Sequence, residues 1–70
     1  MKTYERIRQR IREKGMKYKD IAELGGYQKS TFSMMMNGKR RLYDEDIIKL
    51  CKILGAQPND FIVLEDSEVN

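Results

Sequence analysis

The stretch KYKDIAELGGYQKSTFSMMMNGKRR, residues 17–41, decides the fold of this chain. Its apolar spacing predicts two short helices, Lys17–Leu24 and Gln28–Met36, separated by the pair Gly25-Gly26. Asn37-Gly38 is expected to end the second helix, because both residues tolerate the left-handed backbone of a helix C-cap. The stretch therefore predicts two helices that cross over a very short turn.

A helix is expected on the N-terminal side of this pair, over residues 3–14. Tyr4, Ile7 and Ile11 recur there at helical spacing and form one apolar stripe. Thr3 is the expected N-cap. The cations that surround the stripe are Arg6, Arg8, Arg10, Arg12 and Lys14. This helix is therefore expected to be amphipathic and basic.

Two further helices are expected on the C-terminal side. Asp44-Glu45-Asp46 suits the first turn of the fourth helix, since acids are stabilised near a helix N-terminus. The apolar stripe of that helix, at i, i+3, i+4 and i+7, consists of Ile47, Leu50, Cys51 and Leu54. Pro58 begins a short fifth helix. We expect an all-α domain of five helices over residues 1–64 and an acidic tail over residues 65–70.

The composition fits one small helical domain and argues against several other classes. Seventy residues are close to the lower limit for a single hydrophobic core. No apolar run approaches the roughly 20 residues that span a bilayer, and the N-terminus lacks the apolar stretch of a signal peptide. With one cysteine and no histidine, neither an internal disulfide nor a usual zinc site is expected. We expect a cytoplasmic protein with no metal, no cofactor and no membrane contact.

The positive charge is concentrated in the first part of the chain. Residues 1–43 contain twelve Lys and Arg against four acids, and residues 44–70 contain two against seven. The first segment therefore carries +8 and the second −5, which together give the formal net charge of +3. Such a division favours a polyanion as the partner of one face, with a merely solvated surface as the simpler alternative.

The central helix pair has the residues that a helix-turn-helix at about residues 17–36 requires. Ala22 permits a close crossing, Gly26 permits a positive φ in the turn, and Phe32 anchors the second helix. The side chains expected to point outward are Gln28, Lys29, Ser30, Ser33 and Met34. Gln can pair with adenine and Lys can reach guanine in the major groove. These five residues are therefore the candidate base contacts of a protein that binds double-stranded DNA.

Residues 7–62 resemble the Cro/CI-type (XRE) helix-turn-helix family of phage-repressor-like domains. The resemblance is carried by IREKGMKYKDIAELGGYQKSTFSMMMNGKR and by the later IIKLCKILGAQPNDF. The family pattern, LTQEELAEKLGVSRSTISRIENGKR followed by a helix and LGVSLDELF, aligns without a gap. It implies a five-helix lambda-repressor-like fold and a transcriptional regulator, with residues 28–36 as the recognition helix in the major groove.

The resemblance also implies contacts to phosphates and to a second copy of the chain. The candidate phosphate contacts are Lys17, Tyr18, Asn37, Lys39, Arg40 and Arg41. For Tyr18, packing against the first helix is the alternative. A homodimer is expected to use the fourth-to-fifth helix region and the apolar run Phe61, Ile62, Val63 and Leu64. Such dimers bind near-palindromic operators, with half-sites about 34 Å apart in the phage repressors for which this spacing is known.

Two departures from the family pattern are expected to matter. Gly25 stands where the pattern has a Leu, so we expect the first helix of the pair to end early or to fray. Met34 and Met36 stand where the pattern has Arg and Glu. They are either partly covered neighbours of a core Met35 or an exposed patch that binds a protein partner. Met34 has the further alternative of touching a thymine methyl group.

A second class of function remains open at this point. The chain could be a protein-binding modulator that keeps the fold, such as an antirepressor that pairs with another regulator, or the antitoxin of a toxin–antitoxin pair. Catalysis is not expected, because the sequence has no histidine, no nucleophile–base pair and no metal constellation. The acids at 44–46 suit a helix N-terminus rather than a catalytic cluster.

Overall fold

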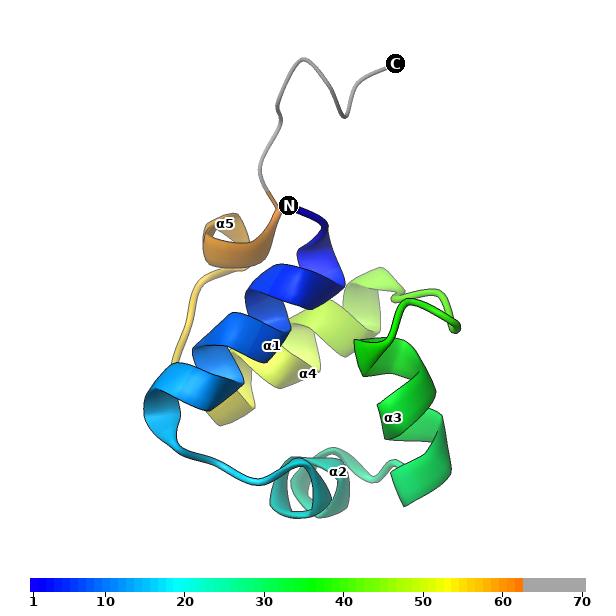
Figure 1. The fold of residues 1–70 in the computed structure, drawn as a ribbon. Coiled ribbons are helices and arrows are strands. Elements are labelled where there is room, and N and C mark those ends of the chain that lie inside the picture. The colour runs from blue at the N-terminus through cyan, green and yellow to red at the C-terminus, as the bar shows by residue number, and fades with distance from the viewer. Residues whose placement is uncertain (63–70) are drawn as a thin grey trace.

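A computed structural model describes residues 1–62 of the chain. These residues form five helices and no strand: α1 (Thr3–Lys14), α2 (Tyr18–Gly25), α3 (Lys29–Met36), α4 (Asp44–Leu54) and α5 (Pro58–Phe61). In Figure 1, α1 and α4 lie across the middle, α2 below them, α3 to their right, and α5 near the start of α1. The expected all-α fold with five helices is confirmed.

The expected bounds of the first four helices and the start of the fifth are confirmed to within one residue. α1 and α4 begin and end where the sequence predicts, and α5 begins at Pro58. α2 begins one residue later and ends one residue later than expected, and α3 begins at Lys29 with Gln28 as its N-cap. Thr3 as the N-cap of α1 was wrong, because Lys2 holds that position and Thr3 is already helical.

Three helices begin with an acid at their third residue that accepts a hydrogen bond from the N-cap amide. The pairs are Lys2 N–H to Glu5 Oε1 at 2.7 Å, Tyr43 N–H to Asp46 Oδ2 at 2.9 Å, and Gln57 N–H to Asp60 Oδ2 at 2.9 Å. Each carboxylate also lies near the positive end of the helix dipole. These bonds stabilise the starts of α1, α4 and α5 although no N-cap residue there is Ser, Thr, Asp or Asn.

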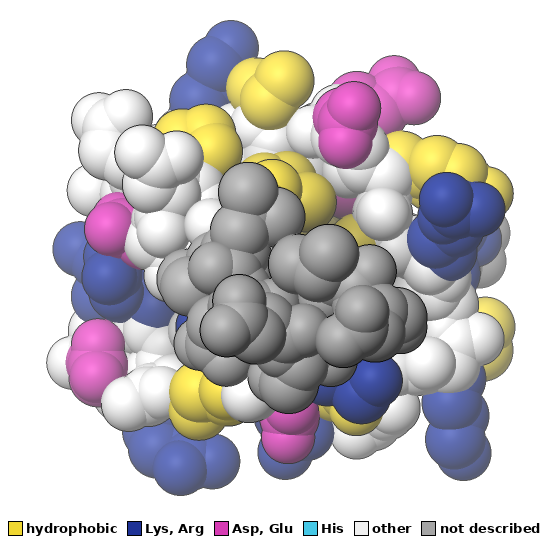
Figure 2. All heavy atoms as spheres, turned by 90° about the horizontal axis from the view of Figure 1, so that it is seen from above, with side chains coloured by type: hydrophobic (Ala, Val, Ile, Leu, Met, Phe, Trp, Pro, Cys, Tyr) yellow, Lys and Arg dark blue, Asp and Glu magenta, His cyan; other side chains and the backbone are white. Residues whose placement is uncertain are grey.

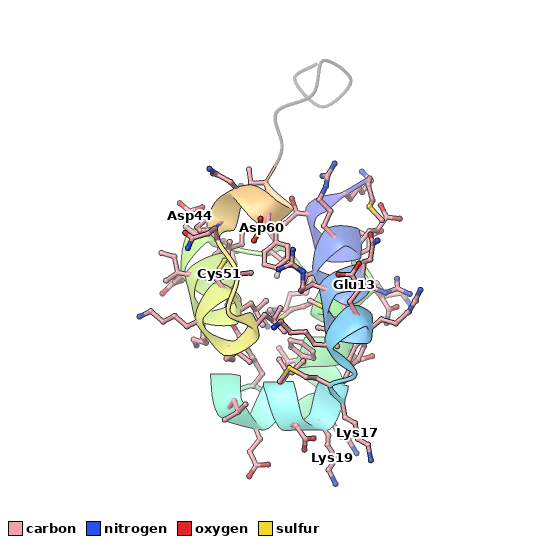
Figure 3. All side chains as sticks on the ribbon, turned by 90° about the vertical axis from the view of Figure 1, so that its left-hand side faces the viewer. Glu13, Lys17, Lys19, Asp44, Cys51 and Asp60 are labelled. Atoms are coloured by element: carbon pink, nitrogen blue, oxygen red, sulfur yellow. The ribbon has the colours of Figure 1, made fainter. Side chains whose placement is uncertain are left out.

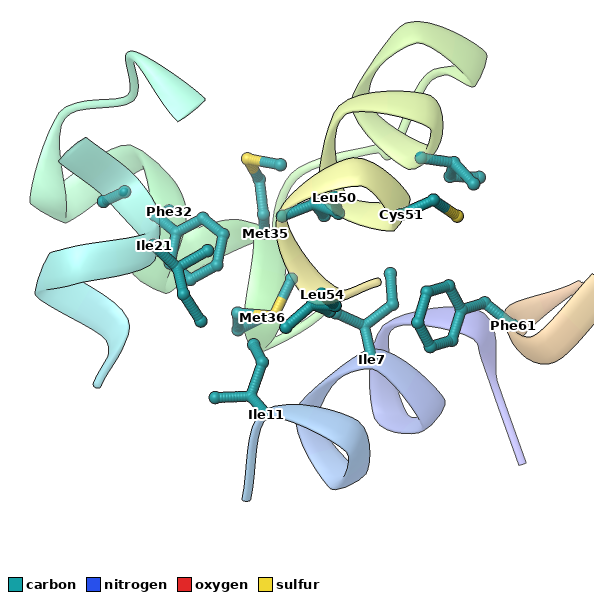
Figure 4. Close-up of a cluster of buried hydrophobic side chains, with 12 residues drawn as sticks. Ile7, Ile11, Ile21, Phe32, Met35, Met36, Leu50, Cys51, Leu54 and Phe61 are labelled. Atoms are coloured by element: carbon teal, nitrogen blue, oxygen red, sulfur yellow. The ribbon is translucent and has the colours of Figure 1, made fainter. Parts of the chain in front are cut away.

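The interior is a single apolar cluster to which all five helices contribute. Its members are Ile7, Ile11, Ile21, Ala22, Phe32, Met35, Met36, Ile47, Leu50, Cys51, Leu54 and Phe61. Figure 4 shows Phe32 and Ile21 at one end of the cluster and Phe61 and Cys51 at the other, with Leu50 between them. Burying a side chain the size of Phe or Leu stabilises the fold by roughly 1.5–3 kcal/mol. The cluster therefore holds α2 and α3 against the other three helices.

Two residues that were candidates for surface contacts lie in this core. Met36 is fully buried and Phe61 has 1% of its surface exposed. Met36 is buried because Phe32, Met35 and Met36 follow at i, i+3 and i+4 and so share the inner face of α3. The ring of Phe61 is covered on one side by the Arg10 guanidinium, 5.6 Å from the ring centroid. Met36 therefore cannot belong to an exposed partner patch, nor Phe61 to an exposed dimer interface.

The expected early end of α2 was also wrong. α2 continues through Gly25, its last residue, and is capped by Gly26, whose φ of 74° is left-handed. The amide of Tyr27 donates a hydrogen bond to the carbonyl of Ala22 at 2.8 Å, which occupies a carbonyl of the last turn. The helix is therefore fully capped where the sequence suggested fraying.

Candidate nucleic-acid interface

α3 has one face in the core and one face open to solvent. The buried face consists of Phe32, Met35 and Met36. The exposed residues are Gln28 at the N-cap and then Lys29, Ser30, Ser33 and Met34. The structure thus brings all five candidate base contacts together on or beside one exposed helix face, with Met34 44% exposed. That they touch bases stays a prediction.

Aromatic rings pack where α2 meets α3. The ring of Phe32 lies edge-on to that of Tyr18, with centroids 5.5 Å apart, and beside that of Tyr27, at 5.8 Å. Such ring pairs add about 0.5–1.5 kcal/mol each beyond the area they bury. Tyr18 therefore packs against α3, while 38% of its surface remains exposed. Its contact to phosphate stays a prediction.

The loop after α3 is ordered by its own backbone. The amide of Asn37 donates to the carbonyl of Ser33 at 3.1 Å, and those of Lys39 and Arg40 both donate to the carbonyl of Met34, at 2.9 and 3.3 Å. The amide of Gly38 donates to Met35 in the same way. These four amides already donate to carbonyls within the chain. What the loop offers to DNA is its side chains.

Two side-chain contacts hold this loop in place. The Asn37 amide nitrogen Nδ2 donates to the Ser33 carbonyl at 2.8 Å, which ties Asn37 back to α3. On the other side, the ring of Tyr4 in α1 lies against Gly38, where an added Cβ would be only 2.6 Å from the ring. The left-handed φ of Gly38, 74°, turns the chain there, whereas Asn37 has a φ of −105°. Of these two residues, both of which tolerate the left-handed conformation, only Gly38 adopts it.

The exposed cations near the helix pair come from two segments. Lys39, Arg40 and Arg41 are exposed in the loop after α3, and the Arg41 guanidinium lies 5.6 Å from the centroid of the Tyr43 ring. Lys17 precedes α2, and Figure 3 shows its side chain and that of Lys19 pointing away from the body of the molecule. Apart from Arg41, which lies over Tyr43, these side chains extend into solvent, where they can reach a polyanion.

The opposite part of the molecule has a different charge pattern. Arg10 is engaged with Asp60 at 3.6 Å and with Glu13 at 3.5 Å. Figure 2, which looks onto the face nearest α5, shows basic and acidic side chains interspersed around the rim. One cation of residues 1–43, Arg10, is therefore compensated on this face by an acid of the later segment, Asp60.

The predicted dimer residues lie in different surroundings. Ile62 is 44% exposed, whereas Val63 and Leu64, like the acidic tail at 65–70, lie outside the described residues. Beside Ile62 is a shallow hollow of about 270 Å³ between α4 and α5. Its lining residues are Asp44, Ile47, Ile48, Pro58 and Ile62. Ile48, 51% exposed, and Ile62 make this the apolar part of the α4–α5 surface.

Sequence reasoning missed one bond that supports the interface. Tyr27 packs on Phe32, and its hydroxyl donates to Asp46 Oδ1 at 2.6 Å. Burial, together with the bond to Asp46, raises the pKa of Tyr27 well above its usual value, so the phenol remains a donor. The two residues are nineteen positions apart, and no local pattern signals their pairing.

Other kinds of site find little support in the described part of the chain. In residues 1–62, no three acidic or cysteine side chains gather as they would around a cation. Burial raises the pKa of the Cys51 thiol, which disfavours the reactive thiolate. None of the helices in residues 1–62 is long and apolar enough to cross a bilayer.

Comparison with known proteins agrees with this geometry. No curated protein and no solved structure gives a significant match. A family model described as "Cro/C1-type HTH DNA-binding domain" matches residues 6–67, which is most of the chain and includes the whole helix pair. With its exposed α3 face and five-helix core, the chain belongs to the Cro/C1-type helix-turn-helix DNA-binding family.

Proposed function

We propose that this chain is a sequence-specific transcriptional regulator of the Cro or repressor kind that places α3 in the major groove of duplex DNA. The observation that carries the proposal is the division of α3 into a core face and an exposed polar face. In this arrangement the first residues of the helix meet the base edges. Gln28 would pair with adenine and Lys29 with guanine, while Ser30, Ser33 and Met34 complete the contact surface.

The flanking cations provide the contact that does not depend on sequence. Lys39, Arg40 and Arg41 follow directly after the recognition helix, and Lys17 and Tyr18 stand at the start of α2. Their contacts with phosphates release counterions, which gives affinity and fixes the register of α3 on the duplex. A regulator of this kind works in the cytoplasm, in a bacterial or phage-infected cell.

The test separates base contacts from phosphate contacts. Duplexes are selected from a random library, and binding to the selected and to a scrambled duplex is measured between about 50 and 200 mM salt. Gln28→Ala should reduce discrimination at one base position by roughly 1–3 kcal/mol. Lys39→Ala should weaken both duplexes alike and reduce the salt slope by about one unit. Failure of the wild-type chain to prefer any duplex at about 150 mM salt would refute the proposal.

The operator-bound form is proposed to be a homodimer joined through the α4–α5 surface. With Phe61 assigned to the core, the exposed candidates are Ile48 and Ile62 beside the apolar hollow. Val63 and Leu64 remain candidates on the sequence alone. Ile48→Glu should shift the chain toward monomer in sedimentation equilibrium, because it places a charge in an apolar contact. Leu24→Glu is the matched control, since Leu24 is also apolar and exposed (67%, against 51% for Ile48) but lies on α2. An unchanged oligomeric state in the Ile48 variant would exclude this surface.

The second candidate is a modulator, an antirepressor or antitoxin, that pairs with another regulator. It is supported by the exposed thioether of Met34 on the outer face of α3, a soft surface suited to protein contacts. Met34→Glu should then abolish binding to that other regulator in a two-protein binding assay. In the DNA-binding proposal the same variant alters only the selected sequence and the affinity for it.

A further inference from the structure

Gly25 is a buried glycine in the last turn of α2. Its φ is not in the left-handed region, so the backbone itself would accept another residue. The surrounding packing leaves no room for a side chain, because a Cβ built on Gly25 lies 2.7 and 2.8 Å from Cε2 and Cδ2 of the Tyr27 ring. Distances this short do not occur between packed carbon atoms. The glycine is therefore required by its neighbour and not by its own conformation.

The Tyr27 ring is held from several sides and cannot simply swing away. It packs on Phe32 of α3, and the ammonium of Lys49 lies 4.7 Å from its centroid. Its hydroxyl donates to Asp46 Oδ1 at 2.6 Å, and the other oxygen of that carboxylate accepts the amide of Tyr43 at 2.9 Å. One side chain thus joins the end of α2 and the start of α3 to the first turn of α4.

We propose that Gly25 and Tyr27 are a complementary pair, in which the missing side chain at 25 makes room for a ring that positions the recognition helix on α4. Tyr27 directly precedes Gln28, the N-cap of α3 and the first candidate base contact. The bond to Asp46 therefore fixes the place and direction in which α3 begins. This explains why Gly25 departs from the Leu of the family pattern without disturbing α2. The positioning role rests on the proposed DNA-binding function.

The pair itself is tested without DNA, by thermal unfolding of Gly25→Ala in two backgrounds. In the wild-type chain the added methyl group meets the ring, so the melting temperature should fall. In the Tyr27→Val background the space is open, and the melting temperature should rise, because Ala is a better helix former than Gly. In the Tyr27→Phe background it should fall again, since the ring is retained. A rise in melting temperature on Gly25→Ala in all three backgrounds would refute the proposal that Gly25 and Tyr27 are a complementary pair.

The positioning role is tested with Tyr27→Phe, which keeps the ring and removes the hydroxyl. At a temperature where the variant is folded, we expect its preference for the selected over a scrambled duplex to fall roughly tenfold, with the salt slope unchanged. Tyr43→Phe, which removes a hydroxyl from the other tyrosine beside Asp46, should keep the wild-type preference. Asp46→Asn retains an acceptor oxygen, so it should lose less of the preference than Asp46→Ala.

Two results would overturn the positioning role: an unchanged preference in Tyr27→Phe, or an equal loss of affinity for both duplexes. If the wild-type chain itself prefers no duplex, the proposed function fails and the positioning role fails with it. The unfolding experiment on Gly25 contains no DNA and still decides whether the pair exists. The two failures are therefore distinguishable.

Discussion

Replacing Gly38 by Ala should be among the most damaging single-methyl changes in this chain. Gly38 has a φ of 74°, and a Cβ there would lie 2.6, 2.7 and 2.9 Å from Cζ, Cε1 and Oη of Tyr4. Gly15 provides a matched control, because its φ is 66° and an added Cβ would meet nothing within 4 Å. The two substitutions therefore share the backbone cost and differ in the contact with Tyr4.

The expected losses follow from these two terms. An L-residue in the left-handed region costs roughly 1–2 kcal/mol, and both variants bear this cost. Overpacking against a ring adds about 1–3 kcal/mol in Gly38→Ala alone. The free energy of unfolding should thus fall by about 1–2 kcal/mol in Gly15→Ala and by about 2–5 kcal/mol in Gly38→Ala. For a domain of this size, each kcal/mol lowers the melting temperature by roughly 4–8 °C.

Urea unfolding followed by circular dichroism measures both losses directly. The variant Tyr4→Ala removes the ring, and in that background Gly38→Ala should cost no more than Gly15→Ala costs in the wild type. Equal losses in the two glycine variants of the wild-type chain would refute the reasoning. Equal losses would mean that the Tyr4 ring does not clash with a side chain at position 38.

Three further outcomes are expected. Met36→Ala should reduce the free energy of unfolding by about 2–5 kcal/mol in urea, whereas Met34→Ala should change it by no more than about 0.5 kcal/mol; similar losses would contradict the separation of the two side chains into core and surface. Phe61→Ala should cost about 3–5 kcal/mol by the same measurement, at protein concentrations where only monomer is present, because its burial is within the chain. The pKa of the Tyr27 hydroxyl is raised in the folded chain, so the unfolded chain loses the phenol proton at a lower pH than the folded chain does. The stability that Tyr27 contributes is therefore complete below the unfolded-state pKa of about 10 and is lost as the pH rises above it. The urea midpoint of Tyr27→Phe should therefore decline less than that of the wild type between about pH 9 and 11, and parallel declines would contradict the assigned environment of the phenol.

The helices could be predicted from the sequence because their signals are local. The spacing of Ile47, Leu50 and Leu54 and the glycines at helix ends act over a single turn or two. The burial of Met36 could have been found in the same way, since it shares the i, i+3, i+4 pattern of Phe32 and Met35. The pattern is hard to recognise because Met36 is the last of three consecutive methionines, which do not all point to the same face of the helix.

Other features of the site could not be predicted, because they depend on residues far apart in the sequence. The contact of Tyr4 with Gly38 and the bond between Tyr27 and Asp46 each join separate helices or loops. Phe61 illustrates a different limit: an apolar residue near the end of a domain has the same sequence signal whether its own core or a second copy buries it. Only its fractional exposure in the folded chain separates the two.

The loop after α3 has a consequence for how such a domain can change its target. Its shape is set by main-chain bonds from residues 37–40 and by Tyr4 against Gly38, and not by the side chains of Lys39 and Arg40. Those two cations can therefore be exchanged without moving the end of α3. The strength of attachment to DNA and the sequence that is recognised become independently adjustable quantities, and little ordering entropy is lost when the loop meets a phosphate.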